Sequence, residues 1–116
     1  MNTNSRACVA DIARAINSGS TSQSIYDYSQ GKHISISGSV SNSSINIFDH
    51  DRRCHLSGNP DSFYDYGTES HISLKISGNQ FRGYAYDQGH HYKGTVSGKS
   101  VSIFDYGEAA YFNYQV

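Results

Sequence analysis

Polar and apolar residues alternate along most of the chain, and one N-terminal segment departs from this pattern. In residues 5–18 apolar side chains recur at helical spacing and form one stripe, which consists of Val9, Ile12, Ala13 and Ile16. Asn4 or Ser5 can cap the start of this helix, and Gly19 suits the position after its end. From residue 22 onward the alternation has a period of two, which is typical of β-strands. The pattern predicts one amphipathic α-helix followed by a mainly β region.

The β region is built from a repeated unit. Ser-Gly pairs recur every 20 residues, beginning at Ser37, Ser57, Ser77 and Ser97. Between them lie five related motifs: IYDY from Ile25, IFDH from Ile47, FYDY from Phe63, AYDQ from Ala85 and IFDY from Ile103. We interpret each copy as one β-hairpin, so residues 22–116 are expected to form an antiparallel up-and-down meander of about ten strands.

The spacing within each copy predicts the turns. In four copies an aromatic or His residue follows the Asp, and a second lies five positions later. These pairs are Tyr28 with His33, His50 with His55, Tyr66 with His71, and Tyr106 with Tyr111. A hairpin with a four-residue loop would place such partners directly opposite each other. The fourth copy fits a tighter turn at Gly89 and His90, and Gly78 with Asn79 fits a two-residue turn.

The alternation divides the strand side chains into two faces. The aliphatic face, which is the predicted core, contains Ile25, Ile34, Ile36, Ile45, Ile47, Leu56, Phe63, Ile72, Leu74, Ile76, Val96, Val101, Ile103 and Phe112. The opposite face carries aromatic residues, histidines and many serines. A closed barrel, with the aliphatic face inward and the helix filling or capping one end, covers the core and leaves no free edge. A curved open sheet with the helix laid across it is the second choice.

Length and charge restrict the function. A chain of 116 residues is expected to form a single domain, 1–116. Nine basic and ten acidic side chains give no charge excess to attract nucleic acid or an anionic membrane. The sequence contains no apolar run long enough for a membrane span and no signal peptide, which predicts a cytoplasmic protein or export by a non-classical route. Cys8 and Cys54 match no metal-binding spacing and are expected to be free thiols, although one disulfide is the alternative.

Two stretches of the sequence resemble known repeats. Residues 83–98, GYAYDQGHHYKGTVSG, resemble a MORN repeat in their glycines, aromatic pair and Tyr-x-Gly. The other four units lack the glycine pair, so no membrane or lipid association is carried over. The motif VSIFDYGEAAYFNYQV with its Ser-Gly entry resembles small bacterial proteins that are built from YDY-type hairpin repeats. That resemblance covers about residues 22–116 and implies a β-hairpin fold and a bacterial source, without an activity.

The repeated polar residues do not form a convincing catalytic or metal site. Each repeat-unit aspartate is expected to cap a turn; they are Asp27, Asp49, Asp65, Asp87 and Asp105. Carboxylates two strands apart are about 9–10 Å from each other, too far to share one ion. The histidines of the outer row, His33, His55, His71 and His91, are similarly spaced. The chain has no nucleophile elbow, Cys-His signature or phosphate-binding glycine motif, so we expect no enzyme, metal or cofactor.

The aromatic face remains as the candidate site. Tyrosines on a rigid sheet can stack on sugars or peptides and order at low entropic cost. The predicted ligand-binding residues are Tyr26, Tyr28, His33, Tyr64, Tyr66, His71, Tyr84, Tyr86, His91, Tyr106 and Tyr111. We expect a non-enzymatic binding module for a glycan, peptide or protein partner. The alternatives are aromatic ladders that only stabilise the sheet, a structural or oligomer-forming protein, and a small ligand carrier or enzyme with its site at a barrel mouth.

Overall fold

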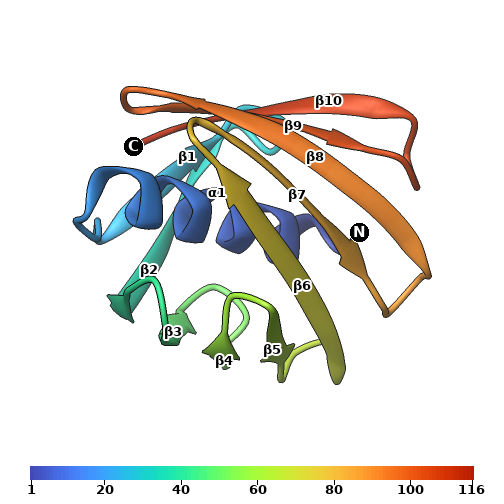
Figure 1. Ribbon diagram of the computed structural model, residues 1–116, viewed down its shortest axis with the longest axis horizontal. Helices are drawn as coiled ribbons and strands as arrows, with labels where there is room; N and C mark the ends of the chain where they lie inside the picture. The colour runs from blue at the N-terminus through green and yellow to red at the C-terminus, as the bar shows by residue number, and fades with distance from the viewer.

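The computed structural model describes residues 1–116 as one helix enclosed by a ten-stranded antiparallel barrel (Figure 1). Helix α1 spans Thr3–Ser18. The strands are β1 (Ser24–Asp27), β2 (Lys32–Val40), β3 (Ile45–Asp49), β4 (Cys54–Asn59), β5 (Ser62–Asp65), β6 (Ser70–Ser77), β7 (Gln80–Ala85), β8 (His90–Ser97), β9 (Ser100–Asp105) and β10 (Ala110–Gln115). Consecutive strands pair as a meander, and β1 pairs with β10. The predicted closed barrel is confirmed, and the open sheet is excluded.

The register within the hairpins differs from the predicted one. Tyr26, not Tyr28, lies opposite His33, and a four-residue loop connects Asp27 to Lys32. The same correction applies to the other three predicted pairs, because His55, His71 and Tyr111 lie opposite Phe48, Tyr64 and Phe104. The error is two residues in each case. A shift of two residues leaves every side chain on its original face, so the predicted faces remain valid.

The fourth hairpin follows the same plan as the others. Ala85 pairs with His90 across a four-residue loop, so the predicted tighter turn at Gly89 and His90 is wrong. Ala85 occupies the position that Asp holds in the other copies, and Asp87 lies exposed in the loop. All five loops share one backbone feature, a positive φ at the last loop residue; these residues are Gly31, Arg53, Glu69, Gly89 and Ala109. The two-residue turn at Gly78 and Asn79 is confirmed.

The aliphatic face points into the barrel, as the alternation predicts. All of the predicted core residues are buried except Ile76 and Phe112, which are partly buried against the same cluster. Tyr92 also lies inside, where its hydroxyl donates to the Ser73 carbonyl oxygen at 2.7 Å. Gly83 lies directly opposite Tyr92, and a Cβ at Gly83 would overlap both the Tyr92 ring and the Ser73 carbonyl. Gly83 therefore makes room for a buried aromatic ring.

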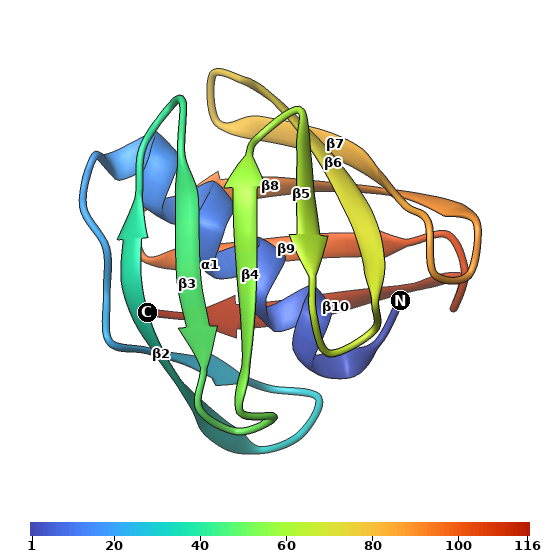
Figure 2. The ribbon, with the colours of Figure 1, turned by 90° about the horizontal axis from the view of Figure 1, so that it is seen from below.

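Helix α1 fills the barrel. Figure 2 shows the helix between strands β2–β5 on one side and β8–β10 on the other. Every residue from Asn4 to Ala15 is buried, so the helix is enclosed all round and not along a stripe alone. Ala7, on the side opposite the predicted stripe, is completely inaccessible. The helix is neither long nor apolar enough to cross a membrane.

The two ends of α1 are capped by different devices. The Asn2 side chain accepts hydrogen bonds from the backbone N–H groups of Asn4 and Ser5 at 3.0 and 3.1 Å. Asn2 is thus the N-cap, and the expectation that Asn4 or Ser5 would serve is wrong. Gly19 ends the helix in the left-handed conformation with φ 76°, as predicted.

The stagger of the hairpins makes room for the helix. On β4, His55 lies opposite Phe48 of its own hairpin, and Ser57 lies opposite Tyr64 of the third hairpin. The third hairpin is therefore offset from the second by two residues. On β2, His33 lies opposite Tyr26 and Ser37 lies opposite Phe48, so the second hairpin is offset from the first by four residues. Large offsets tilt the strands and widen a barrel with a given number of strands. A helix whose middle carries mainly alanine and small aliphatic side chains fits inside this barrel.

The second half of the helix buries two charged residues. The Asp11 carboxylate accepts a hydrogen bond from the Ser22 hydroxyl at 2.9 Å. Burial raises the pKa of Asp11 to about 6, although the Ser22 bond and the nearby Arg14 charge act in the opposite direction. Arg14 donates to the Ser18 hydroxyl and the Ser20 carbonyl, while its Nε has no partner. The cost of burying the ionised carboxylate is therefore only partly offset.

Substitution of Ala7 tests the enclosure of the helix. We expect Ala7→Gln to lower the free energy of unfolding by about 2–4 kcal/mol, because the larger side chain overfills the interior and buries an unpaired amide. Thr3→Gln, at an exposed position of the same helix, is the matched control. Urea denaturation measures both. Equal stability of the two variants would mean that α1 lies on the surface of the sheet.

Asp11 predicts a dependence of stability on pH. Its folded-state pKa lies above the ordinary value, so its ionisation destabilises the fold as the pH rises through about 6. We expect Asp11→Asn to be more stable than the unmodified protein by about 1–3 kcal/mol at pH 7, and this difference should vanish near pH 4. Asp61→Asn, in an exposed turn, should show no such convergence. Thermal denaturation between pH 4 and pH 7 gives the comparison.

Candidate functional site

Each of the five hairpins carries three rings on its outer face. A central ring on the first strand packs against one ring two residues later and one directly across on the second strand. Ring centroids are 4.7–5.0 Å apart, with interplanar angles of 66–78°. We call these groups the aromatic triads: Tyr26 with Tyr28 and His33, Phe48 with His50 and His55, Tyr64 with Tyr66 and His71, Tyr84 with Tyr86 and His91, and Phe104 with Tyr106 and Tyr111. Edge-to-face packing of this kind fixes the orientation of the rings.

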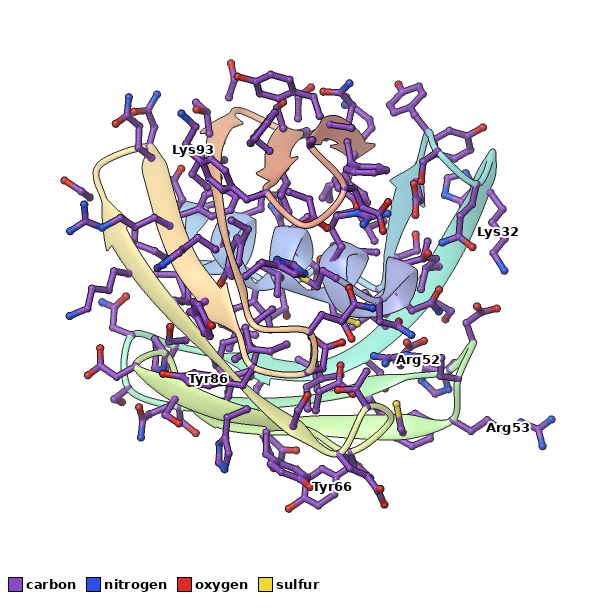
Figure 3. The ribbon with its side chains drawn as sticks, turned by 90° about the vertical axis from the view of Figure 1, so that its right-hand side faces the viewer. Lys32, Arg52, Arg53, Tyr66, Tyr86 and Lys93 are labelled. Carbon is purple, nitrogen blue, oxygen red and sulfur yellow. The ribbon has the colours of Figure 1, made fainter.

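The flanking rings of the triads face solvent. The central rings are half-buried, whereas Tyr66 and Tyr86 are 56% and 60% exposed. Figure 3 shows both of these side chains on the outside of the wall. Tyr92 and Tyr114, both buried, are the tyrosines whose hydroxyl groups hydrogen-bond within the chain. The hydroxyl groups of the outer tyrosines are therefore free to bind a ligand.

All eleven predicted site residues lie in aromatic triads. The prediction missed the whole second triad and the central ring of the fifth; the missed residues are Phe48, His50, His55 and Phe104. The signal was present in the repeat, because Phe48 and Phe104 occupy the position that Tyr26 and Tyr64 hold in their own hairpins. Position within the unit, not residue type, identifies a triad.

The triads lie near one end of the barrel and surround it. Neighbouring triads are two strands apart, which corresponds to about 9–10 Å. Because the strands tilt, the offset of two to four residues between hairpins keeps successive triads at a similar level. The arrangement is a belt of similar aromatic groups and not one concave pocket.

Buried aspartates fix the loops beside this belt. The Oδ1 atoms of Asp27, Asp65 and Asp105 accept the N–H of the second loop residue at 2.8–2.9 Å, and Asp49 does the same. Turn capping is thus confirmed for these four residues. It is wrong for Asp87, which lies in its loop. Ala85, at the corresponding position, has no carboxylate to offer.

Three of these carboxylates, those of Asp49, Asp65 and Asp105, also hold the start of α1. Asp49 accepts from Asn4 Nδ2 at 3.3 Å, Asp65 accepts from the Ser5 hydroxyl, and Asp105 accepts from Arg6 Nη1 at 3.0 Å. Negative charge is favourable at this helix end, because the free N–H groups give it a partial positive charge. Each of these aspartates therefore ties an outer loop to the enclosed helix.

Arg52 links two of the aspartates. Its Nε lies 2.6 Å from Asp49 Oδ2, and its Nη2 lies 3.1 Å from Asp65 Oδ2. Burial acts to lower the pKa of Arg52, but the bonds to Asp49 and Asp65 outweigh it and raise that pKa. Figure 3 shows Arg52 turned toward the wall and Arg53 pointing outward. The next residue in sequence therefore serves as a natural control.

The cysteines and histidines offer little reactive chemistry. Cys8 and Cys54 are both free, and burial raises the pKa of both thiols, which keeps them protonated and weakly nucleophilic. No three His, Cys, Asp or Glu side chains are grouped so that they could hold a metal ion. The triad histidines, such as His33 and His71, lie on separate hairpins, and each packs against an aromatic ring of its own hairpin. The triad histidines therefore serve as packing partners of aromatic rings in this structure.

Comparison with protein-family models, curated proteins and solved structures found no match to this chain. The resemblances to bacterial YDY-type repeats and to a MORN unit therefore rest on the sequence motifs alone.

Substitution of Arg52 tests the link between loops and helix. We expect Arg52→Gln to lower the free energy of unfolding by about 2–4 kcal/mol, because it leaves the buried carboxylates of Asp49 and Asp65 without their cation. Arg53→Gln should change the stability by no more than about 0.5 kcal/mol, since that side chain is exposed. Guanidinium denaturation of both variants decides the matter, and a similar loss in each would show that the ion pairs contribute nothing specific.

Proposed function

We propose that this protein is a non-enzymatic binding module whose aromatic triads engage a glycan. The observation that supports the proposal is the repetition of one exposed ring arrangement on all five hairpins. A polysaccharide is itself a repeated structure, so it can contact several similar groups around the barrel at once. Weak contacts at single triads then add to a useful affinity through multivalency.

The chemistry of the triads suits sugar rings. A tyrosine ring offers an apolar face for stacking, and its hydroxyl group can exchange hydrogen bonds with a ligand. Imidazole nitrogens of the triad histidines add donors and acceptors beside these rings. Because the central ring holds each flanking ring at an edge-to-face angle, little side-chain entropy remains to be lost on binding. The outer tyrosines thus combine apolar area with unpaired polar groups.

The alternatives find less support. A carrier of small ligands needs an internal cavity, and α1 occupies the interior of the barrel. Assembly by strand addition needs a free sheet edge, which a closed barrel lacks. Aromatic ladders do stabilise sheets, by about 0.2–1 kcal/mol for each cross-strand pair. That role accounts for the half-buried central rings better than for flanking rings such as Tyr66 and Tyr86, which remain more than half exposed.

Removal of two exposed rings tests the proposed function. We expect Tyr66→Ala combined with Tyr86→Ala to weaken binding to the glycans selected on an array by about tenfold, because two contact groups are lost. Stability should fall by no more than about 1 kcal/mol. Ser39→Ala, at an exposed strand position away from any triad ring, is the control. An array without a single bound glycan at high protein concentration, or unchanged affinity in the double variant, would refute the proposal.

A further inference from the structure

Three cationic side chains lie on the outer face of the strand wall, whereas Lys32, the other exposed strand cation, lies at the first residue of β2 and pairs with Asp51. Lys75 on β6, Arg82 on β7 and Lys93 on β8 alternate with the buried residues of their strands and therefore point to the outside. The remaining outward positions carry serine, threonine, asparagine, glutamine, histidine or an aromatic residue. Charge on the wall is thus confined to one place. We call these three residues the basic row.

The members of the basic row are direct neighbours. Lys75 lies opposite Arg82, and Arg82 lies opposite Lys93, in the cross-strand register. None of the six ion pairs in the protein includes any of them. Like charges directly opposite each other destabilise a sheet. A row of adjacent cations without acidic partners destabilises the folded protein. Stability therefore does not explain why these three residues lie together.

The basic row separates two hollows in the outer surface, and both hollows include its three residues. One, of about 710 Å³, has polar side chains beside the row; they are Ser77, Gln80, Thr95 and Ser102. The other, of about 830 Å³, is bordered by Tyr84 and His91 of the fourth triad and by Tyr106 of the fifth. The Lys93 Nζ lies 5.9 Å from the centre of the Tyr106 ring. The two hollows share these three side chains, so cations, hydrogen-bonding groups and aromatic rings lie side by side, and we call the two hollows together the groove.

We infer that this groove binds an acidic glycan segment, with sugar carboxylates on Lys75, Arg82 and Lys93 and sugar rings against Tyr84 and Tyr106. This inference rests on the proposed function and specifies its ligand class. Adjacent strands are about 4.8 Å apart, so the row extends over roughly 10 Å and matches a short segment with few charges. A nucleic acid calls for a strongly basic surface, whereas this chain has nine basic and ten acidic side chains in all. A short basic row beside aromatic rings on a nearly neutral protein therefore favours a carboxylated saccharide over a polynucleotide.

Polygalacturonate and its carboxyl-reduced, neutral form are the matched probes. We expect the protein to bind polygalacturonate at least about tenfold more tightly than the neutral polymer, and this preference should fall as NaCl is added. The triple variant Lys75→Gln, Arg82→Gln and Lys93→Gln should bind polygalacturonate about tenfold more weakly. Lys99→Gln, in the exposed turn after β8, should change the affinity by less than about twofold. Isothermal calorimetry measures all four combinations.

Thermal denaturation separates loss of binding from loss of folding. Removal of like-charge repulsion should leave the melting temperature of the triple variant unchanged or higher, so weaker binding by that variant has a local cause. If both polymers bind equally and the triple variant has no effect, the proposed role of the basic row in ligand binding is refuted, whereas glycan binding itself is not. Failure of both polymers to bind would overturn the inference, whereas the array with the tyrosine variants separately decides the proposed function. Tighter binding of polyuridylate than of polygalacturonate would also overturn it, in favour of a nucleic acid.

Discussion

The enclosure of a helix inside a closed sheet is the constraint on which the rest of the structure depends. Ten strands with large offsets surround a space that must be filled, because an empty apolar interior would forfeit its packing contacts. A helix fills that space only if its polar groups find partners away from water. The repeat supplies them at one end, since Asp49, Asp65 and Asp105 turn inward to meet Asn4, Ser5 and Arg6. In three hairpins, the aspartate that marks the repeat in the sequence therefore also binds the start of the helix.

Each of these three carboxylates serves the loop with one oxygen and the helix with the other. Asp65, for example, accepts the Gly67 N–H on Oδ1 and the Ser5 hydroxyl on Oδ2. The backbone that carries the flanking ring Tyr66 is consequently tied to the core. The fourth hairpin lacks this device, and its loop ends in Gly89, which adopts a positive φ without a steric cost. There His90 reaches Asp105 at 3.3 Å, so the neighbouring aspartate is shared between hairpins.

The sequence predicts the parts of this structure that depend on parity and repetition. A period of two places Ile25 inside and Tyr26 outside whichever register is chosen, so the core and the aromatic face could be predicted without knowing the pairing. Register itself could not, because rings two residues apart, such as Tyr26 and Tyr28, fit the same pattern. The apolar stripe did not predict that the helix is buried on all sides. Ala7, on the opposite side, is too small to indicate by its residue type whether that side is buried. Lys75, Arg82 and Lys93 are distant in sequence, and only the observed register makes them neighbours.

A filled barrel leaves its outer wall as the surface on which ligands can be recognised, and that wall is not uniform. Five triads repeat around it, which favours a repetitive ligand, but the basic row occupies strands β6–β8 alone. The fourth hairpin lies at the centre of this difference. Unlike the other hairpins, it has no aspartate at the end of its first strand, and it places Gly83 and Gly94 opposite buried rings. It also carries two of the three cations. Repetition provides the contact area, and the hairpin that departs most from the repeat provides the charge that can distinguish one glycan from another.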